Sequence, residues 1–191
     1  MCYTLSAMSA KALVVFADGF EDIEAVSIVD VLRRGGVEVV AASLNAEPYA
    51  ISAHGIQMST DAVLADVLED EYDAIILPGG GEGTENLKNC EPLLERLRKQ
   101  REAGGLICAI CAAPTVLEAA GVIEDESVTC YPSCRADMGR HVDDVPVVAD
   151  GQVITGQAPG AAMLFALVVL AHLEGGRRAH SVANGMVTNF E

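Results

Sequence analysis

The sequence carries little positive charge. Its 191 residues include 12 lysines and arginines but 28 aspartates and glutamates, which gives a formal net charge of −16 and a pI near 4.4. A chain with this balance repels nucleic acid and anionic membrane surfaces. We therefore expect neither nucleic acid nor a membrane as a partner, and look instead to small molecules and other proteins.

Long hydrophobic runs are also missing. The longest apolar stretch, residues 158–173, is interrupted by Pro159 and Gly160 and is too short to span a membrane, so we interpret it as a buried helix. The start of the chain is small and polar, without a basic segment followed by an apolar one, and does not resemble a secretory signal. These two absences predict a cytoplasmic location.

The cysteine content is too low for a disulfide scaffold, since a chain of this length has only six cysteines. The inferred compartment is also reducing. We therefore expect free thiols, reactive sites or metal ligands rather than structural disulfides.

Apolar residues, in contrast, are abundant. They make up 51% of the sequence and the mean hydropathy is +0.31, which is enough to bury a sizeable core. The length favours one domain, which we place at residues 11–191. Residues 1–10 are expected to form an N-terminal extension that could be disordered, and Met8 is an alternative start.

Strands and helices are predicted to alternate. Residues 12–17 form a continuous apolar run rich in β-branched side chains, as expected for a strand covered on both faces. Apolar residues at helical spacing follow over residues 21–34, and two glycines end that helix. The pattern repeats, with strands at residues 37–44, 74–77 and 106–110, helices at 92–102, after Cys111, at 160–174 and at 177–188, and hairpins at 49–59 and 145–155. This order predicts an α/β fold with a doubly wound, mostly parallel sheet and helices on both faces.

One cysteine occupies the junction between a strand and a helix. The segment 106–121, LICAICAAPTVLEAAG, places a buried strand directly before Cys111 and an alanine-rich helix directly after it. Small neighbours such as Ala112, and Pro114 in the first helical turn, suit the cramped turn of a nucleophile elbow. The thiol would face a helix N-terminus, which stabilises a thiolate and lowers its pKa. Cys111 is therefore the predicted nucleophile, and a small buried hydrophobic residue is the alternative.

Other cysteines allow further interpretations. Cys108 lies within the apolar strand and is expected to belong to the core, which argues against a redox pair with Cys111. The spacing Cys108-x2-Cys111-x18-Cys130-x3-Cys134 approximates a four-cysteine zinc ribbon, but a buried strand is a poor place for a zinc ligand. We predict no metal site.

The turns after other strands should approach Cys111, because ligands of parallel sheets bind beyond the carboxyl ends of the strands. After the first strand, Glu24 lies on a half-buried helix face, where a carboxyl group has a raised pKa and can hold or relay a proton. A solvated surface glutamate is the alternative. After the strand at residues 74–77, Gly79 and Gly80 let backbone N–H groups come close to a substrate, as an oxyanion site requires. A simple tight turn would have the same sequence.

Four segments resemble the ThiJ/PfpI superfamily, most closely the branch of the Parkinson-disease-associated protein deglycase and bacterial YajL. They read ALVVFADGFEDIEAVSIVDVLRRGG, DAIILPGG, AICAAPTVL and GQAPGAAMLFAL, and the likeness runs from about Lys11 to Val187. The resemblance implies a flavodoxin-like fold and a homodimer. It also implies a glyoxalase that converts methylglyoxal to lactate without a cofactor, a deglycase of early glycation adducts, or an oxidative-stress sensor or chaperone.

The resemblance also implies roles for single residues. Cys111 matches the family's reactive cysteine, Glu24 its protonated glutamate, and Gly80 and Ala112 the backbone donors around the cysteine. Tyr131 stands near the site where the deglycase has a histidine, so activity could be weaker or differently tuned. Ala112 also stands where the protease-like branch has a histidine, and a protease is not expected.

The function we expect is a cofactor-independent cysteine enzyme acting on methylglyoxal-type α-oxoaldehydes or early glycation adducts, in defence against oxidative and carbonyl stress. The alternative is a redox sensor or chaperone in which the same cysteine is oxidised with little catalysis. If residues 128–131 form a strand, Cys130 points away from the site when Tyr131 points into it. Cys134 is then the candidate that could resolve an oxidised Cys111 into a disulfide, and two incidental free thiols are the alternative.

Overall fold

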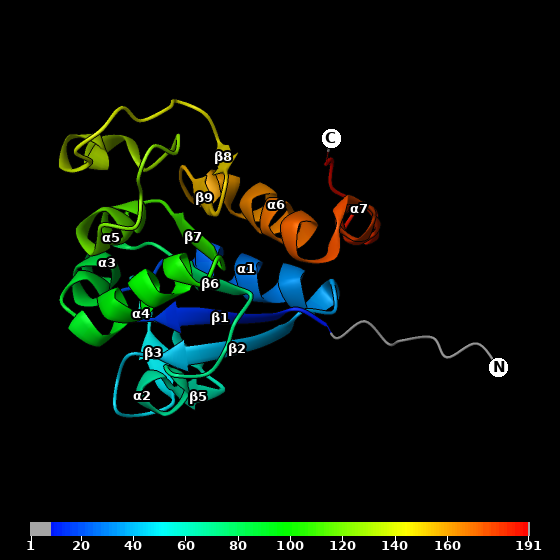
Figure 1. The fold of residues 1–191 in the computed structure, drawn as a ribbon. Coiled ribbons are helices and arrows are strands. Elements are labelled where there is room, and N and C mark those ends of the chain that lie inside the picture. The colour runs from blue at the N-terminus through cyan, green and yellow to red at the C-terminus, as the bar shows by residue number, and fades with distance from the viewer. Residues whose placement is uncertain (1–8, 191) are drawn as a thin grey trace.

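The computed structural model describes residues 9–190 (Figure 1). Most of the predicted N-terminal extension, including the alternative start at Met8, lies outside the described residues. One sheet contains seven strands in the spatial order β5 (Ala62–Val63), β2 (Glu38–Ser43), β1 (Lys11–Phe16), β6 (Ala74–Leu77), β7 (Leu106–Ile110), β9 (Val153–Gly156) and β8 (Val147–Asp150). Neighbouring strands run parallel except β8 and β9, which form the predicted hairpin. A second hairpin, β3 (Tyr49–Ile51) and β4 (Gln57–Ser59), pairs separately.

The central strands are covered on both faces, which explains their continuous apolar sequence. In β1, alternate side chains enter different cores: Leu13 packs on one face of the sheet, and Val14 and Phe16 pack on the other. All four residues of β6 are buried, as are the last four of β7. The sheet therefore divides the interior into two hydrophobic cores.

Helices form a layer on each face (Figure 1). One layer holds α1 (Asp22–Arg34), α6 (Ala162–Glu174) and α7 (Gly176–Gly185), and the other holds α3 (Gly81–Lys88), α4 (Glu91–Glu102) and α5 (Pro114–Ala120). A short helix, α2 (Leu64–Val67), follows β5, and two 3-10 helices span η1 (Pro132–Asp137) and η2 (Pro159–Ala161). The predicted doubly wound, mostly parallel sheet with helices on both faces is confirmed. None of the helices within residues 9–190 has the length and apolar character needed to cross a bilayer.

The sequence pattern does not predict three short elements, β5, α2 and α3. The glycine-rich start of α3 is a poor helix former by intrinsic propensity. Packing requires the second of its two glycines, however, because a Cβ atom on Gly83 would lie 2.9 Å from the backbone nitrogen of Phe20. Tertiary contacts therefore determine this helix more than its own sequence does.

The segment 128–131 is not a strand, so the alternation of faces considered for Cys130 and Tyr131 does not apply. The backbone N–H of Thr129 donates to the hydroxyl of Thr155 at 2.8 Å. The hydroxyl of Thr129 lies 2.9 Å from the carbonyl oxygens of both Asp143 and Val145. Threonine side chains thus hold this segment beside β9 in place of the hydrogen-bond ladder that a strand would form.

Candidate active site

The turns after β1, β6 and β7 meet at the carboxyl edge of the sheet, as predicted. A backbone hydrogen bond joins the first two turns, in which the N–H of Glu21 donates to the carbonyl oxygen of Gly79 at 2.9 Å. The third turn begins at Cys111, whose Cβ atom lies only 2.6 Å from the position that a Cβ on Gly79 would take. Three loops that are distant in sequence therefore surround one thiol.

Cys111 has a strained backbone. Its φ of 65° lies in the left-handed region, which costs a non-glycine residue roughly 1–3 kcal/mol. Its N–H donates to the carbonyl oxygen of Gly156 at 2.9 Å, and its own carbonyl oxygen accepts the N–H of Tyr131 at 2.7 Å. Only 8% of the residue is exposed. A strained, clamped turn after a buried strand has the geometry of a nucleophile elbow.

The helix after the elbow begins later than the sequence indicates. Residues 111–113 form a turn, and α5 starts at Pro114, in the first helical turn as predicted. The helix has seven residues, so its dipole is small. The donors that reach the sulfur are single backbone N–H groups, those of Ala112 and Gly80.

The predicted lowering of the Cys111 pKa is wrong. Burial raises the pKa of the thiol, and the charge and hydrogen bonding of Glu24 raise it further. The N–H groups of Ala112 and Gly80 act in the opposite direction without outweighing these effects. The sulfur therefore keeps its proton while Glu24 is ionised, and a thiolate forms only when a base accepts that proton.

Glu24 can be that base. It lies in the first turn of α1 and is 0% exposed, deeper than the half-buried face that the sequence predicts. Its Oε2 atom accepts the N–H of Gly79 at 2.7 Å. Burial raises the pKa of its carboxyl group to about 7 against the opposing effects of the Gly79 N–H and the Cys111 thiol, and the charge on Glu21 adds to the shift. Near neutral pH this carboxyl group can therefore both hold and release a proton.

The second carboxylate oxygen of Glu24, Oε1, is also buried. It has no hydrogen-bond partner of good geometry within residues 9–190. The Cys111 thiol nevertheless acts on the same carboxyl group as a hydrogen-bond donor. We conclude that the contact between thiol and carboxyl group is long or poorly aligned, as is common in sites without a bound substrate.

Two glycines make room for the pair. A Cβ on Gly79 would lie 2.6 Å from the Cβ of Cys111 and 2.8 Å from Oε2 of Glu24. Gly80 has a φ of 102°, and a Cβ there would lie 2.1 Å from the carbonyl oxygen of Gly19. Neither position can accept a side chain without moving the site.

Glu21 caps α1, a role that the sequence pattern does not reveal. Its Oε2 atom accepts the N–H of Glu24 at 2.8 Å, which fixes the first turn of α1 where Glu24 lies. The signal for it is its place directly before the helix, although glutamate is not among the residues most common there. The carbonyl of Gly156, which clamps Cys111, belongs to the last residue of β9 and is identified only by the sheet register.

Tyr131 approaches Cys111 through its backbone, and its residue is 42% exposed. The structure does not group the predicted resolving residue, Cys134, with Cys111. Cys134 packs with Cys130 against the core beside α4 and α5, whereas Cys111 belongs to the core beside α1 and α6. Cys108, fully buried in β7, also belongs to the core that contains Cys111.

The four-cysteine zinc ribbon is therefore not assembled, because its members are divided between two cores. Within residues 9–190, three potential metal ligands come within 4.8 Å of one another only at Glu21, Asp22 and His54. Those side chains already have partners, since Asp22 Oδ2 lies 2.6 Å from His54 Nδ1 and Glu21 caps α1. We assign no metal to them.

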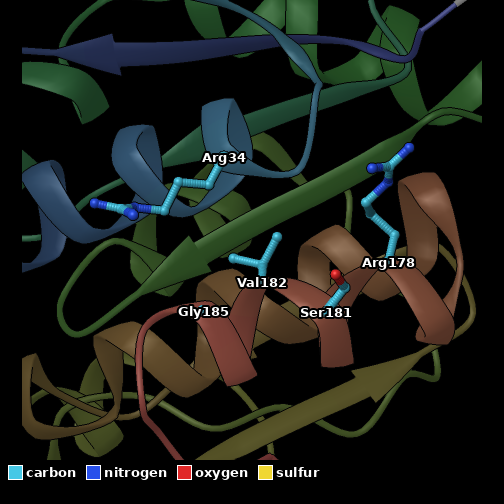
Figure 2. Close-up of a pocket in the computed structure, with 5 residues that line it drawn as sticks. All are labelled: Arg34, Arg178, Ser181, Val182 and Gly185. Atoms are coloured by element: carbon cyan, nitrogen blue, oxygen red, sulfur yellow. The ribbon is translucent and has the colours of Figure 1, made fainter.

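A shallow hollow of about 270 Å³ lies elsewhere, between α1 and α7 (Figure 2). Its lining consists of Arg34, Arg178, Ser181, Val182 and Gly185. The two arginine side chains point away from each other in Figure 2, so their charges do not converge on one ligand. None of these residues comes from the turns around Cys111, and the candidate site remains at the elbow.

Comparisons with known proteins agree with this geometry. The family model for the DJ-1/PfpI family matches residues 10–172. The chain is 40% identical to protein dj-1beta of Drosophila melanogaster over 186 residues, which cover 96% of this chain and 100% of that protein. The crystal structure of the Drosophila protein gives a TM-score of 0.93 over the same shares of the two chains.

Two further relatives are similar over nearly the whole chain. A Caenorhabditis elegans protein named glutathione-independent glyoxalase DJR-1.2 is 37% identical over 182 residues, covering 93% of this chain and 96% of the relative. The structure of oxidized Toxoplasma gondii DJ-1 is 33% identical with a TM-score of 0.90, covering 95% of this chain and 100% of that one. The flavodoxin-like fold expected from the resemblance is thus confirmed. The elbow cysteine, the buried glutamate and these similarities together show that the chain belongs to the DJ-1/PfpI family.

Proposed function

We propose that the protein is a cofactor-independent enzyme that uses Cys111 as a nucleophile on methylglyoxal-type α-oxoaldehydes or on early glycation adducts. The observation that carries this proposal is the pairing of a thiol on a strained elbow with a fully buried carboxyl group whose pKa is about 7. A thiol becomes a strong nucleophile when an adjacent base removes its proton. Glu24 is a base matched to neutral pH.

The chemistry follows from these two groups. Glu24 accepts the thiol proton, and the sulfur forms a bond to the aldehyde carbon, giving a hemithioacetal. The carbonyl oxygen becomes an alkoxide as the C=O double bond breaks, and the N–H groups of Gly80 and Ala112 can stabilise that charge. Glu24 returns its proton to this oxygen. Two proton transfers then give a thioester: the proton on the former aldehyde carbon moves to the neighbouring ketone carbon, and the hydroxyl proton moves to the ketone oxygen. Water cleaves the thioester to a hydroxy acid and the free thiol.

The name of the Caenorhabditis elegans relative supports this choice of substrate class. That relative is described as independent of glutathione, so its reaction does not take a thiol from glutathione. In our proposal the protein supplies the thiol itself, through Cys111. An early glycation adduct holds the aldehyde as a hemiaminal on a protein amine. When its C–N bond breaks, the amine gains a proton, the hydroxyl group loses one and the C=O bond forms again. Cys111 can then attack that carbon, which makes the deglycase reaction a variant of the same chemistry.

A redox-sensing role for Cys111 is the second candidate. Oxidation to a sulfinate adds two oxygens to the sulfur, and the protonated form of Glu24 could donate a hydrogen bond to one of them. One structural relative was determined in an oxidized form. Catalysis and redox sensing need the same residues. Only a measurement of substrate turnover can therefore distinguish the two functions.

We also propose a homodimer in a reducing, cytoplasmic setting. Two apolar side chains of α1, Ile23 and Val26, are 58% and 56% exposed, and Ile56 in the hairpin loop is 60% exposed. Contiguous apolar side chains on a surface are typical of an interface with another chain. The five cysteines within residues 9–190 are free thiols, as a reducing compartment requires.

The deciding experiment is steady-state conversion of methylglyoxal with direct measurement of lactate. The wild type should turn over many equivalents, Cys111→Ser should have none above the uncatalysed rate, and Cys90→Ser should match the wild type. Cys90 is a suitable control because it is a free, partly exposed thiol directly before α4. If Cys111→Ala turned over methylglyoxal at the wild-type rate, the proposal that Cys111 is the nucleophile of an enzyme would be rejected. If peroxide oxidised Cys111 in a wild-type protein that showed no turnover, the redox-sensor function would be favoured.

A further inference from the structure

A second pair of thiols lies in the segment that clamps the elbow. Cys130 is fully buried and Cys134 is partly exposed, and both pack with the core on the α4 and α5 side of the sheet. Cys111 packs with the core on the other side. Cys134 is near enough to Cys130 to raise the pKa of the Cys130 thiol.

One carbonyl group connects the two cysteines. The carbonyl oxygen of Tyr131 accepts the N–H of Cys134 at 2.8 Å and lies 3.4 Å from the sulfur of Cys130, which donates to it. The first bond closes a turn over residues 131–134. Because the Cys130 sulfur lies against the same oxygen atom, it is close to the backbone N–H of Cys134. The two cysteines are therefore near enough in the chain and in space for a small adjustment to bring their sulfurs together.

The two thiols differ in their accessibility. Burial and the neighbouring Cys134 raise the pKa of Cys130 to about 11, against a small opposing effect of Arg135. A protonated, buried thiol is protected from direct oxidation. Cys134 is the more exposed of the two, so it meets a dissolved oxidant first and Cys130 reacts second.

We propose that Cys130 and Cys134 are a reversible redox site, which a hydroperoxide oxidises to an intramolecular disulfide without the participation of Cys111. The sulfur of Cys134 attacks the O–O bond, acquires a hydroxyl group and releases water or an alcohol. The sulfur of Cys130 then displaces that hydroxyl group, which leaves as water with the thiol proton, and the S–S bond forms. The two thiols lose two electrons, the hydroperoxide gains them, and a dithiol reductant reverses the reaction.

The Cys130 and Cys134 site is connected to the nucleophile, Cys111, through the backbone of Tyr131. The N–H of Tyr131 holds the carbonyl of Cys111, and the carbonyl of Tyr131 holds both members of the pair. Forming the bridge removes the S–H donor of Cys130 from that carbonyl. Oxidation of the pair therefore changes the peptide group that clamps the elbow.

Peptide mapping tests the proposal directly. The full chain is treated with hydrogen peroxide, its remaining thiols are alkylated, and it is digested with trypsin and a glutamate-specific protease. Cleavage after Glu126 and Arg135 places Cys130 and Cys134 together in one peptide, residues 127–135. Cleavage after Glu102 and Glu118 places Cys108 and Cys111 in a different peptide. The expected product is peptide 127–135 with no alkyl group and no second peptide attached. Its mass should be two hydrogens below that of the same peptide with free thiols. After reduction it should take up two alkyl groups.

Variants and alternative products decide the outcome. Cys130→Ser and Cys134→Ser should each abolish the light peptide, whereas Cys90→Ser and Cys111→Ser should still give it. A peptide 127–135 that is fully alkylated when Cys111 is already oxidised would overturn the proposal. A cross-link between 127–135 and the Cys111 peptide would overturn it in favour of the Cys111–Cys134 bridge. Both results come from the wild type, so they do not depend on the folding of any variant, and neither requires methylglyoxal turnover.

Discussion

The Oε2 atom of Glu24 accepts a hydrogen bond from the backbone N–H of Gly79 at 2.7 Å, across 55 positions of the sequence. This bond joins the first turn of α1 to the turn after β6. It fixes a fully buried carboxyl group beside the thiol of Cys111, and the other oxygen of that group has no well-aligned partner among residues 9–190. The protein thereby keeps a titratable group inside its core at the place where the proposed reaction needs a proton carrier.

The buried carboxyl group should make stability depend on pH. The folded state binds the Glu24 proton more tightly than the unfolded state, because the pKa is about 7 when folded and 4.5 ordinarily. This contribution is complete below pH 4.5, and it should decrease by up to about 3 kcal/mol as the pH rises from 4.5 to about 7. Urea unfolding of the wild type and Glu24→Gln across this range gives the difference curve. A flat difference would show that Glu24 is not perturbed.

The alkylation rate of Cys111 should bend near neutral pH. Below pH 7 the thiolate population rises with pH, and the rate with iodoacetamide rises with it. Above about pH 7 the thiol and Glu24 share one proton, so the population of thiolate beside a protonated Glu24 becomes independent of pH. In Glu24→Gln the rate should continue to rise through this region and exceed the wild-type rate in alkaline solution. An identical bend in both proteins would count against shared protonation.

A methyl group on Gly79 should disturb the site. In Gly79→Ala the new Cβ would lie 2.6 Å from the Cβ of Cys111 and 2.9 Å from the carbonyl oxygen of Ile110, so we expect a loss of about 1–3 kcal/mol in unfolding free energy. Alkylation of Cys111 should slow in parallel. Gly81→Ala is the matched control, because a Cβ there would meet nothing within 4 Å. Thermal unfolding measures both, and equal effects at the two positions would contradict the packing argument.

The N–H of Tyr131, rather than its side chain, should matter for the elbow. Tyr131→Pro removes the donor to the Cys111 carbonyl at a φ of −58°, which proline accepts, and should cost about 1–3 kcal/mol through the unpaired carbonyl. Tyr131→Phe changes only a side chain whose residue is 42% exposed, and should stay within about 0.5 kcal/mol of the wild type. Denaturant midpoints measure both changes. A larger loss in the phenylalanine variant would assign the role to the phenol group.

The sequence predicts those strands and helices whose hydrophobic pattern matches the way they are buried in the fold. The runs that become β1, β6 and β7 are apolar because both faces of the sheet are covered, and the elbow at Cys111 follows from the short distance between strand and helix. The segment 128–131 has strand-like composition, but its backbone bonds to the hydroxyl of Thr155, the N–H of Asp143 and the carbonyl of Cys111, which only the fold brings together. Composition does not reveal such partners.

The electrostatics of the site are harder to predict than its residues. The position of Glu24 on α1 indicates partial burial, whereas its complete burial depends on the turn after β6 closing over it. Burial and the Glu24 carboxylate raise the pKa of the Cys111 thiol, whereas two backbone N–H donors lower it. The direction of the pKa shift depends on which of these opposing effects is larger. These quantities arise from distances between loops that lie far apart in the sequence.

Cys111 and Ala113 belong to different cores although only one residue separates them. The chain therefore passes from one side of the sheet to the other within the elbow itself. A change in the packing of the α1 and α6 layer would act on the thiol through Cys111 itself. A change in the packing of the α4 and α5 layer would act on it through Ala113. The chemical reactivity of this single sulfur is consequently a reporter on both halves of the interior, and a change in its labelling rate can record a disturbance that begins far from the site.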